Sequence, residues 1–428
     1  MEDYKTYTLE ELSIGKGSYG IAASAVPFNV SLYTYLRITD INDDGTLNKS
    51  GLMSVDEDDA EKYLLKPNDI VFARTGNSTG RSYFYDGSDG ELVYAGFLIK
   101  FSLDSTKVNP RILKYYTHSK PYYDWVQSFG TGSTRGNINA KTYGNMPITL
   151  PPRDIQDKIV DVLKSLDDKI EVNKQINDNL EQQAQALFKS WFVDFEPFKD
   201  GEFVESELGM IPKGWKVGRY EEIIETTISG DWGKEKPEGN YVHKVACIRG
   251  CDFQDIKNGL RGNTPERYIL EKNYQSKHFH HNDVLVEISG GTQTVSTGRV
   301  CPVSQLLIDK FNADIVCTNF CRVIRPIASY AAYLYYSWLY KYNGKVMFGY
   351  ENGTSGIKNF RIKDFISVEP VVIPPVDLLG KFQKFVDSVQ LQIQTRGSES
   401  SRLASLRDTL LPRLMTGKLK VNEIEYAI

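Results

Sequence analysis

The stretch LPPRDIQDKI (150–159) recurs 223 residues later, in similar form, as IPPVDLLGKF (373–382). At this same offset the apolar residues continue to coincide as far as Trp191 and Leu414, with spacings of three and four. Such spacing is typical of an amphipathic helix, and proline is tolerated at a helix start but not inside a helix. The sequence therefore predicts two helices of about 40 residues, each ~60 Å long.

The similarity between the two halves also extends upstream of the paired prolines. Three pairs of segments match in order: YKTYTLEEL (4–12) with WKVGRYEEI (215–223), NDIVFARTGNSTGR (68–81) with NDVLVEISGGTQTVSTGR (282–299), and GSTRGNIN (132–139) with GTSGIKNF (353–360). Each half thus contains a start motif, a β-rich region with Gly-rich loops, a proline pair and a long helix. The chain is a tandem duplication with two copies.

The duplication predicts an α+β fold, with two pseudo-symmetric β-rich globular domains separated by two long antiparallel coiled-coil-like helices. A lone amphipathic helix must bury its apolar stripe, and the other copy is the obvious partner. A pseudo-twofold axis would make the pair antiparallel. The expected boundaries are a first domain at 1–150, a central helix at 151–198, a linker at 199–214, a second domain at 215–372 and a C-terminal helix at 373–428.

Polar residues interrupt the apolar stripe near the middle of both helices. Asn173 matches Arg396, and Asn177 matches Ser400, while Gly397 costs ~1 kcal/mol relative to Ala inside a helix. One interpretation is a helix break or hinge at this point. The other is a polar layer that fixes the register of the helix pair.

Composition indicates a folded protein of two or three domains. The chain has 428 residues, of which 41% are hydrophobic and 12% aromatic. The first residues, MEDYKTYTLEEL, are polar and acidic, and no stretch approaches the ~20 apolar residues of a membrane span. Five cysteines without secretory context favour reduced thiols. We expect a cytoplasmic protein with no membrane association.

The net charge of −4 hides a local pattern. Residues 96–153 hold eight Lys/Arg against two acids, and residues 318–363 hold seven Lys/Arg against one acid, whereas residues 40–62 hold eight acids against two Lys/Arg. Both basic segments precede a proline pair, so they occupy equivalent places in the repeat. One such run is usually a solvated face. Two at matching positions favour a DNA-binding role.

Polar residues among glycines fill the matching loops of both halves. Arginine recognises guanine, Asn and Gln recognise adenine, and Ser and Thr bind phosphates or bases, while glycine permits close backbone approach. A single such loop would be an ordinary turn, but two copies indicate DNA recognition. The candidate DNA-binding residues are Arg74, Thr75, Asn77, Ser78, Thr79, Arg81, Ser133, Thr134, Arg135, Asn137 and Lys141 in the first half, and Thr292, Gln293, Thr294, Ser296, Thr297, Arg299, Thr354, Ser355, Lys358, Asn359 and Arg361 in the second.

Catalytic motifs are weak. GKGSYG (15–20) fits a dinucleotide-binding pattern but lacks the preceding strand and following helix, so we expect a loop. Asp283 and Glu287 give only part of a nuclease metal site. The Cys-x₃-Cys pairs beginning at Cys247 and Cys317 have no counterpart in the first half, which favours buried free thiols over a shared zinc site. We expect no catalytic residue, metal or cofactor in this chain.

The organisation resembles the specificity subunit of type I restriction-modification enzymes. The segments that carry the resemblance are YLRITDI (35–41), NDIVFARTGNSTG (68–80), LPPRDIQDKIVDVLKSLDDKIEVNKQ (150–175), ALFKSWFVDFEPF (186–198), IPKGW (211–215) and LASLRDTLLPRLMTGKLKV (403–421). Together they span essentially the whole chain.

The resemblance implies two target-recognition domains, each contacting one half of a bipartite double-stranded DNA site with a fixed spacer between the halves. It also implies two modification subunits that carry S-adenosylmethionine, and restriction subunits that use ATP and Mg²⁺. Methylation and cleavage would belong to these partners. Two alternatives remain: a single-chain DNA methyltransferase or nuclease with an unrecognised motif, and a coiled-coil scaffold that never binds DNA.

Overall fold

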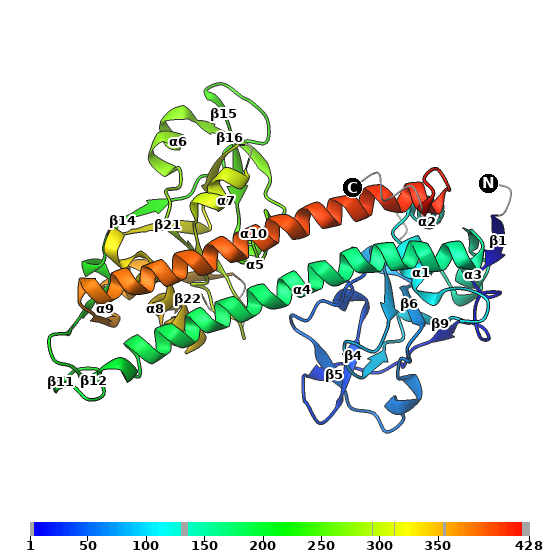
Figure 1. Ribbon diagram of the computed structural model, residues 1–428, viewed down its shortest axis with the longest axis horizontal. Helices are drawn as coiled ribbons and strands as arrows, with labels where there is room; N and C mark the ends of the chain where they lie inside the picture. The colour runs from blue at the N-terminus through cyan, green and yellow to red at the C-terminus, as the bar shows by residue number, and fades with distance from the viewer. Residues whose placement is uncertain (1–3, 130–135, 293, 312, 354–356, 422–428) are drawn as a thin grey trace. The chain divides into compact units, whose positions relative to one another are not determined.

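The computed structural model describes residues 4–129, 136–292, 294–311, 313–353 and 357–421 (Figure 1). The chain forms two compact units. Unit 1 combines residues 1–168 with 403–428, and unit 2 comprises residues 169–402. Each unit contains mixed helices and strands, so the expected α+β class with two β-rich domains and two long antiparallel helices is confirmed.

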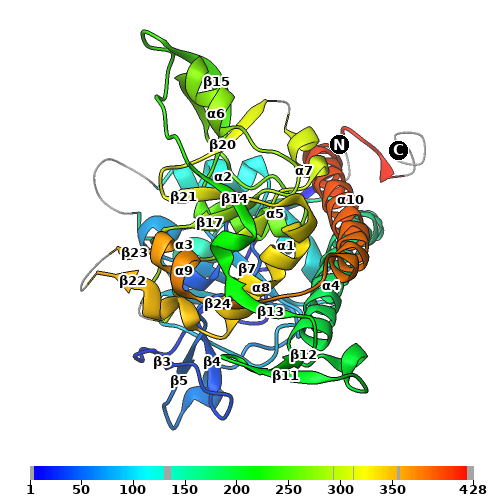
Figure 2. The same ribbon diagram turned by 90° about the vertical axis from the view of Figure 1, so that its left-hand side faces the viewer.

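The two long helices begin directly after the paired prolines, as predicted. Helix α4 spans Arg153–Phe192 and helix α10 spans Val376–Met415. They lie side by side and antiparallel within each unit (Figures 1 and 2). In unit 1 the Arg407 guanidinium pairs with Asp167 at 2.9 Å, and in unit 2 the rings of Phe192 and Phe382 pack with centroids 5.2 Å apart.

The polar residues in the middle of the pair form an ordered layer in unit 2. The Asn173 amide donates to Glu399 at 2.8 Å and to Ser400 at 3.3 Å, although Asn173 is only 1% exposed. Asn177 donates to the carbonyl oxygen of Ile393 at 3.3 Å. Both helices continue without a break through these positions. The hinge is therefore wrong and the polar layer is confirmed.

Gly397 marks the closest backbone approach in this part of unit 2. A Cβ at Gly397 would lie 2.5 Å from the Cα of Gly259 and nearer still to its carbonyl group. Gly259 itself has φ +75°, a conformation that favours glycine. Lys310 donates to the Gly259 carbonyl, and Gln394 donates to the carbonyl of Ile256 at 3.2 Å. Glycine at 397 thus permits a turn of the β-rich domain to sit directly on α10. We call this contact the Gly259–Gly397 junction.

Each unit is built around a four-stranded antiparallel sheet with the same strand order. In unit 1 the order is β2 (Ser18–Tyr19), β9 (Leu98–Ser102), β6 (Asp69–Ala73) and β7 (Ser82–Tyr85); in unit 2 it is β14 (Ile224–Ser229), β21 (Cys321–Pro326), β17 (Val284–Glu287) and β19 (Val300–Pro302). The central registers also agree, since Ile70 opposes Phe101 and Val284 opposes Ile324. The repeat seen in the sequence is a repeat in three dimensions.

A second sheet and a closing strand pair also recur in both units. The second sheet is β3 (Val26–Pro27), β5 (Met53–Val55), β4 (Tyr33–Leu36) and β8 (Leu92–Tyr94) in unit 1, and β16 (Glu266–Leu270), β15 (Tyr241–Ile248) and β20 (Asp314–Cys317) in unit 2. The start motif pairs with the strand before the prolines, through β1 (Lys5–Thr8) with β10 (Pro147–Leu150) and β13 (Lys216–Arg219) with β24 (Pro370–Ile373). Each long helix therefore leaves its domain from the same closing pair.

Short helices alternate with the strands in both units, and only some of these helices lie in the basic segments. They are α1 (Pro110–Tyr116), α2 (Lys120–Gln127) and α3 (Ala140–Gly144) in unit 1, and α5 (Phe253–Lys257), α6 (Glu271–Lys277), α7 (Gln305–Lys310), α8 (Ala331–Asn343) and α9 (Ile362–Val368) in unit 2. Helix α8 is almost entirely buried around Trp338. In the described part of the chain, no helix combines the length and apolarity that a membrane crossing requires.

The segment expected to be a linker contains a β-hairpin. Strands β11 (Phe203–Ser206) and β12 (Gly209–Pro212) pair antiparallel. Gly209 follows the turn with φ +90°, and the Ser206 hydroxyl donates to its carbonyl at 2.6 Å. The Pro, Gly and charged residues that suggested a linker therefore belong in part to this β-hairpin.

Candidate nucleic-acid interface

Two polar segments that are distant in the sequence lie together in unit 1. The first is the loop 74–81 after β6, and the second is the segment 136–141. Thr75 forms an antiparallel bridge with Asn137, and the Thr79 hydroxyl donates to the carbonyl of the residue before Asn137 at 3.0 Å. The candidate residues of these two segments therefore share one surface.

Unit 2 assembles the equivalent segments in the same way. The residues just after β17 form β18 (Ser289–Gly290), which pairs with β23 (Lys358–Phe360), with Ser289 opposite Asn359. Strand β23 also pairs with β22 (Glu351–Asn352). Six candidates, namely Ser133, Thr134, Arg135, Gln293, Thr354 and Ser355, lie outside the described residues. The others form two matched pairs of polar loops, one pair in each unit.

Glu351 holds the loops of unit 2 together. It accepts hydrogen bonds from the Thr297 backbone at 2.6 Å and hydroxyl at 2.9 Å, and pairs with Lys358 at 2.8 Å. Burial would raise the pKa of Glu351, but the Lys358 ammonium and the two Thr297 donors lower this pKa below its usual value. Glu351 is therefore held in its charged form as an anchor beneath the loops.

The candidates differ in what they can offer to a ligand. Ser78, Ser296 and Thr297 are 8%, 4% and 0% exposed, so they support the loops from inside in this conformation. Half-buried candidates are Arg74, Thr75, Thr79, Arg81, Arg299, Lys358 and Arg361, and exposed ones are Asn77, Asn137, Lys141, Thr292, Thr294 and Asn359. Direct contact of this exposed set with DNA stays a prediction.

Most basic candidates are tied to carboxylates. Arg81 pairs with Asp43 at 2.6 Å, Arg299 forms a bidentate pair with Glu287 at 2.7 and 2.8 Å, and Arg361 pairs with Asp364 at 2.7 Å. Arg74 differs: it has no carboxylate partner within the described ranges, and its guanidinium lies 5.0 Å from the ring centre of Tyr19. Its Nε is buried and makes no hydrogen bond. Among the candidate arginines of the described residues, Arg74 is thus the one that no carboxylate neutralises.

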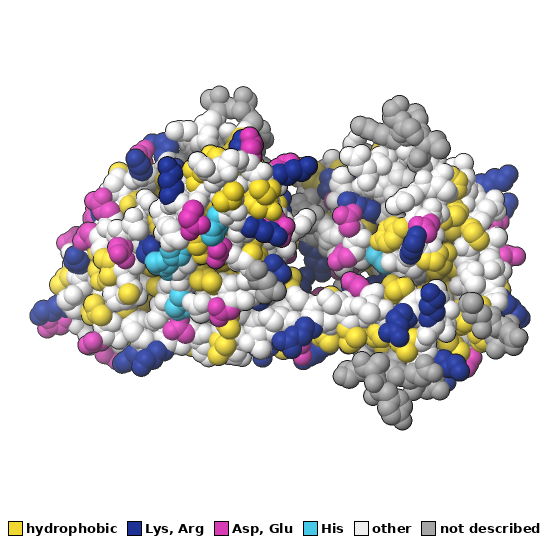
Figure 3. Space-filling view, turned by 90° about the horizontal axis from the view of Figure 1, so that it is seen from above, with side chains coloured by type: hydrophobic (Ala, Val, Ile, Leu, Met, Phe, Trp, Pro, Cys, Tyr) yellow, Lys and Arg dark blue, Asp and Glu magenta, His cyan; other side chains and the backbone are white. Residues whose placement is uncertain are grey.

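The positive charge of the two basic segments is partly neutralised in the folded protein. Carboxylates from elsewhere neutralise several of their side chains, as in the pairs Arg111–Asp86, Arg325–Asp283 and Lys341–Glu369. Figure 3 shows acidic and basic side chains interspersed over one face of the molecule. The polar loops are therefore a better guide to the interface than the charge of the segments that contain them.

Asp283, one of the two acids of the partial nuclease pattern, and its counterpart Asp69 in unit 1 have structural partners. Asp69 and Asp283 are 2% and 1% exposed and follow Asn68 and Asn282, which both have positive φ of 77° and 73°. Each aspartate accepts a hydrogen bond from the backbone three residues earlier, at 2.8 and 2.7 Å. The repeated Asn-Asp pair thus builds a turn at the start of β6 and β17. Within the described ranges, no group of three His, Cys, Asp or Glu could hold a metal.

The five cysteines are free thiols, and the burial expected for the two Cys-x₃-Cys pairs is wrong at Cys251. Cys247, Cys301, Cys317 and Cys321 are buried in unit 2, whereas Cys251 is exposed. Burial raises the pKa of Cys247, Cys301 and Cys321 to about 12. These three thiols stay protonated and pack as small apolar groups.

The GKGSYG segment is explained by packing. It contains the two-residue strand β2 and no helix, so the expected loop is wrong at Ser18 and Tyr19 and holds for the other residues of the segment. A Cβ at Gly20 would lie 2.5 Å or less from the backbone of Ala95, and one at Gly17 would enter the ring of Phe101. Its glycines serve close packing against the sheet.

One repeated pair was missed by the sequence comparison. In unit 1 the Arg37 guanidinium binds Asp40 through two hydrogen bonds of 2.7 and 2.8 Å, and Arg249 binds Asp252 in unit 2 at 3.0 Å for both. Each arginine also donates to a carbonyl fourteen residues later. Aligning YLRITDI with ACIRGCDF (246–253) would have found the pair. It locks a turn in each domain and carries no free charge.

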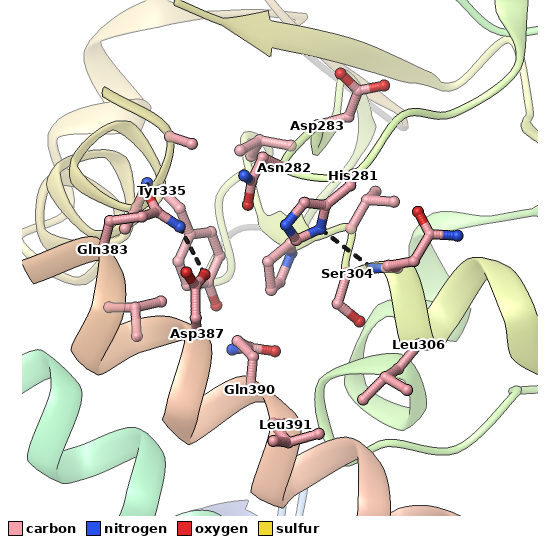
Figure 4. Close-up of a pocket in the computed structure, with 17 residues that line it drawn as sticks. His281, Asn282, Asp283, Ser304, Leu306, Tyr335, Gln383, Asp387, Gln390 and Leu391 are labelled. Carbon is pink, nitrogen blue, oxygen red and sulfur yellow. Dashed lines mark hydrogen bonds between the residues drawn. The ribbon is translucent and has the colours of Figure 1, made fainter. Parts of the chain in front are cut away.

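A cavity of about 300 Å³ lies between α8, α10 and the segment around His281 in unit 2 (Figure 4). Some of its polar groups are engaged with one another: His281 accepts from the backbone of Gln305 at 3.2 Å, and Gln383 donates to Asp387 at 2.8 Å. The Tyr335 hydroxyl is buried without a hydrogen-bond partner in the described structure. Figure 4 shows Gln390 and Leu391 projecting from α10 toward this space. The cavity holds no nucleophile next to a free base among the residues that line it.

The units define a class of protein: a duplicated recognition protein, with paired polar loops in each unit and a pair of long antiparallel helices. Comparison with known proteins agrees. Residues 1–182 match the family model described as the type I restriction modification DNA specificity domain. The chain is 30% identical over 319 residues to the type I restriction enzyme MjaIX specificity subunit of Methanocaldococcus jannaschii, covering 73% of this chain and 69% of that protein.

Two further relatives extend the match. The HindI specificity subunit of Haemophilus influenzae is 25% identical over 477 residues, covering 98% of this chain and all of that protein. The crystal structure of the type I restriction-modification S subunit from M. genitalium has a TM-score of 0.50 at 15% identity, covering 96% of each chain, and shares the fold. The chain belongs to the family of type I restriction enzyme specificity subunits.

Proposed function

We propose that this chain binds a bipartite site in double-stranded DNA, with one half-site per unit and a fixed unread spacer between them. The observation that carries the proposal is the repeated assembly of two polar loops. Thr75 pairs with Asn137 in unit 1, and Ser289 pairs with Asn359 in unit 2. Two equivalent surfaces in one chain suit two half-sites.

The exposed side chains of these loops have the chemistry of base and phosphate contacts. The amides of Asn77, Asn137 and Asn359 can each donate and accept, as bidentate recognition of adenine requires. Arg74 is half-buried and has no carboxylate partner among the described residues. The buried members of the loops, held by Glu351 in unit 2, keep these groups in place. Differences between the loops would give each unit its own half-site.

The proposed role is recognition without catalysis. Two modification subunits that bind S-adenosylmethionine would methylate the DNA, and restriction subunits that use ATP and Mg²⁺ would cleave it. The two long helices would carry the modification subunits and set the spacer. Family membership and the engagement of the loop carboxylates in ion pairs support this assignment.

The test is the methylated motif of cells that express the chain with its modification partner. We expect a bipartite motif for the wild type. The double variant Arg74→Ala/Asn77→Ala should relax one half-site, and Thr294→Ala/Asn359→Ala should relax the other. Each lost bidentate base contact costs about 1–3 kcal/mol of discrimination. Lys62→Ala and Lys213→Ala, at basic residues with 74% and 67% exposed side chains, are matched controls for lost surface polarity.

The outcomes separate the alternatives. If both double variants alter the same half-site, the units are not separate recognition elements. If the purified chain alone methylates or cuts DNA, it is an enzyme in its own right. If the complex with its modification partner shows no salt-dependent DNA binding, the chain is a scaffold and the proposal fails.

A further inference from the structure

A phenylalanine projects into solvent at the same point of each unit. Phe97 stands just before β9, and Phe320 stands just before β21. Both side chains are 59% exposed. A single exposed apolar residue is ordinary on a protein surface. Chance exposure of one apolar residue does not explain why both copies of the repeat expose a phenylalanine at the same position.

The turns that carry the two rings are built alike. In unit 1 the Leu98 N–H donates to the carbonyl of Ala95 at 2.8 Å, and in unit 2 the Cys321 N–H donates to the carbonyl of Thr318 at 3.0 Å. Each phenylalanine is therefore the third residue of a four-residue turn.

A glycine lies under each turn. A Cβ at Gly230 would lie 2.5 Å from the carbonyl oxygen of Cys317 and closer to that of Thr318. Gly20 makes the equivalent approach to the backbone of Tyr94 and Ala95 in unit 1. In each unit a glycine therefore packs its backbone directly against the turn that carries the ring.

The sequence around the two rings shares little else. The segments YAGFLIKF (94–101) and CTNFCRVI (317–324) occupy the same register in the two sheets, and the phenylalanine is their only identical residue. Strand burial needs only apolar character at most of these positions. Burial cannot account for a residue that points outward, so its retention in both copies indicates a contact with something outside the chain.

Each ring also belongs to the polar-loop surface. The Arg74 N–H donates to the carbonyl of Phe97 at 3.1 Å, and the Ile288 N–H donates to that of Phe320 at 2.8 Å. Arg74 begins the first polar loop of unit 1, and Ile288 directly precedes strand β18 of unit 2. In unit 1 the half-exposed ring of Tyr19 lies beside Arg74. The rings therefore sit where the candidate base-contacting groups sit.

We propose that Phe97 and Phe320 are specificity-determining residues, each of which places its ring against base edges of one half-site of duplex DNA. An apolar ring can contact a thymine methyl group or wedge against a base step. The inference deepens the proposed function and rests on it. It assigns an apolar contact to surfaces whose other candidates are polar or charged.

The test uses the complex of the full chain with its modification partner. Phe97→Ala and Phe320→Ala should each lower affinity for the cognate duplex about ten-fold, which is in the range of one mismatched base pair in a specific site. The slope of log affinity against log salt should stay unchanged, because no phosphate charge is lost. The methylated motif should relax at one position of one half-site for Phe97→Ala, and of the other half-site for Phe320→Ala. Phe97→Leu and Phe320→Leu should retain part of the discrimination.

Matched controls lie at the opposite ends of the same strands. Ile14 is 67% exposed beside Ser102 at the end of β9, and Ile327 is 41% exposed directly after β21. Ile14→Ala and Ile327→Ala should keep the wild-type motif and affinity. Thermal unfolding midpoints near the wild-type value would establish that the phenylalanine variants are folded, and the leucine variants carry the test if an alanine variant is not.

Three results would overturn the proposal. One is a wild-type bipartite motif retained by both Phe→Ala variants. Another is a folded Phe→Ala variant with which the modification partner no longer co-purifies, since the rings would then contact protein. The third is an equal effect of each variant on both half-sites. A wild-type complex without any bipartite motif would instead refute the proposed function on which the inference depends.

Discussion

Substituting alanine for Gly397 should destabilise unit 2, although alanine is the better helix former. Helix propensity alone would stabilise the variant by up to about 1 kcal/mol. The added Cβ would however lie within 2.5 Å of the Gly259 backbone, so the turn at Gly259 must retreat by about 1 Å to restore ordinary contact. Retreat breaks the polar contacts of the Gly259–Gly397 junction.

Three hydrogen bonds set the magnitude. Asn177 donates to the carbonyl of Asn258, Lys310 to that of Gly259, and Gln394 to that of Ile256. Each contributes about 1 kcal/mol, and more where the donor stays buried and unpaired. Against the gain in propensity, we expect a net loss of about 2–3 kcal/mol for Gly397→Ala.

Gly380 supplies the matched control on the same helix. A Cβ there would meet nothing within 4 Å, so Gly380→Ala should stabilise α10 by about 0.8–1 kcal/mol. Both substitutions restrict the unfolded chain equally, and the difference between them isolates the contact in the folded state. Urea unfolding followed by tryptophan fluorescence is a suitable assay, because four of the five tryptophans, all but Trp125, lie in unit 2. If Gly397→Ala raises the urea midpoint of unfolding as much as Gly380→Ala does, the Gly259–Gly397 junction does not stabilise unit 2.

Two further predictions concern the length of the helix pair and the pH dependence of the free energy of unfolding. Inserting four residues after Asp168 and four after Arg402, at the boundary between the units, lengthens both helices by ~6 Å. Because B-DNA rises ~3.4 Å per base pair, the spacer of the methylated motif should grow by one or two base pairs. An active complex with its original spacer would show that the helices do not set the spacer length. Burial lowers the pKa of Lys310 to about 8 in the folded protein, below its value in the unfolded chain. Between about pH 8 and 10.4 the unfolded chain therefore binds more protons, so the free energy of unfolding should rise with pH relative to that of Lys310→Met. Parallel curves of unfolding free energy against pH for the two proteins would contradict this prediction.

The sequence predicted the features that depend on local pattern. Apolar spacing and paired prolines gave both long helices, and matching segments gave two β-rich domains with equivalent loops. Asn173 and Asn177 were identified as central polar residues because they interrupt a regular stripe. These signals are contained in short windows of sequence, and their structural consequences are largely fixed by helix and strand geometry.

Other features depend on contacts that no short window contains. Gly397 suggested a weak point in the helix because its partner, Gly259, lies 138 residues away. Arg299 suggested a free cation for DNA, but Glu287 from the neighbouring strand neutralises it. The outward position of Phe97 and Phe320 became visible only when the strand registers aligned the two turns. Tertiary partners decide whether a residue is available to contact a ligand, and these partners lie far from the residue in the sequence.

The way the two units divide the chain has a consequence for the order of folding. Unit 2 is one continuous segment, whereas unit 1 needs both chain ends: Leu410 and Leu414 of α10 share a core cluster with Leu9 and Ile159. The Tyr4 hydroxyl donates to the carbonyl of Leu414, 410 residues later, at 3.2 Å. At a synthesis rate of roughly 5–20 residues per second, the N-terminal domain waits some tens of seconds for its last helix. The domain that is synthesised first is therefore completed last, and part of its apolar core stays uncovered until the end of α10 has left the ribosome.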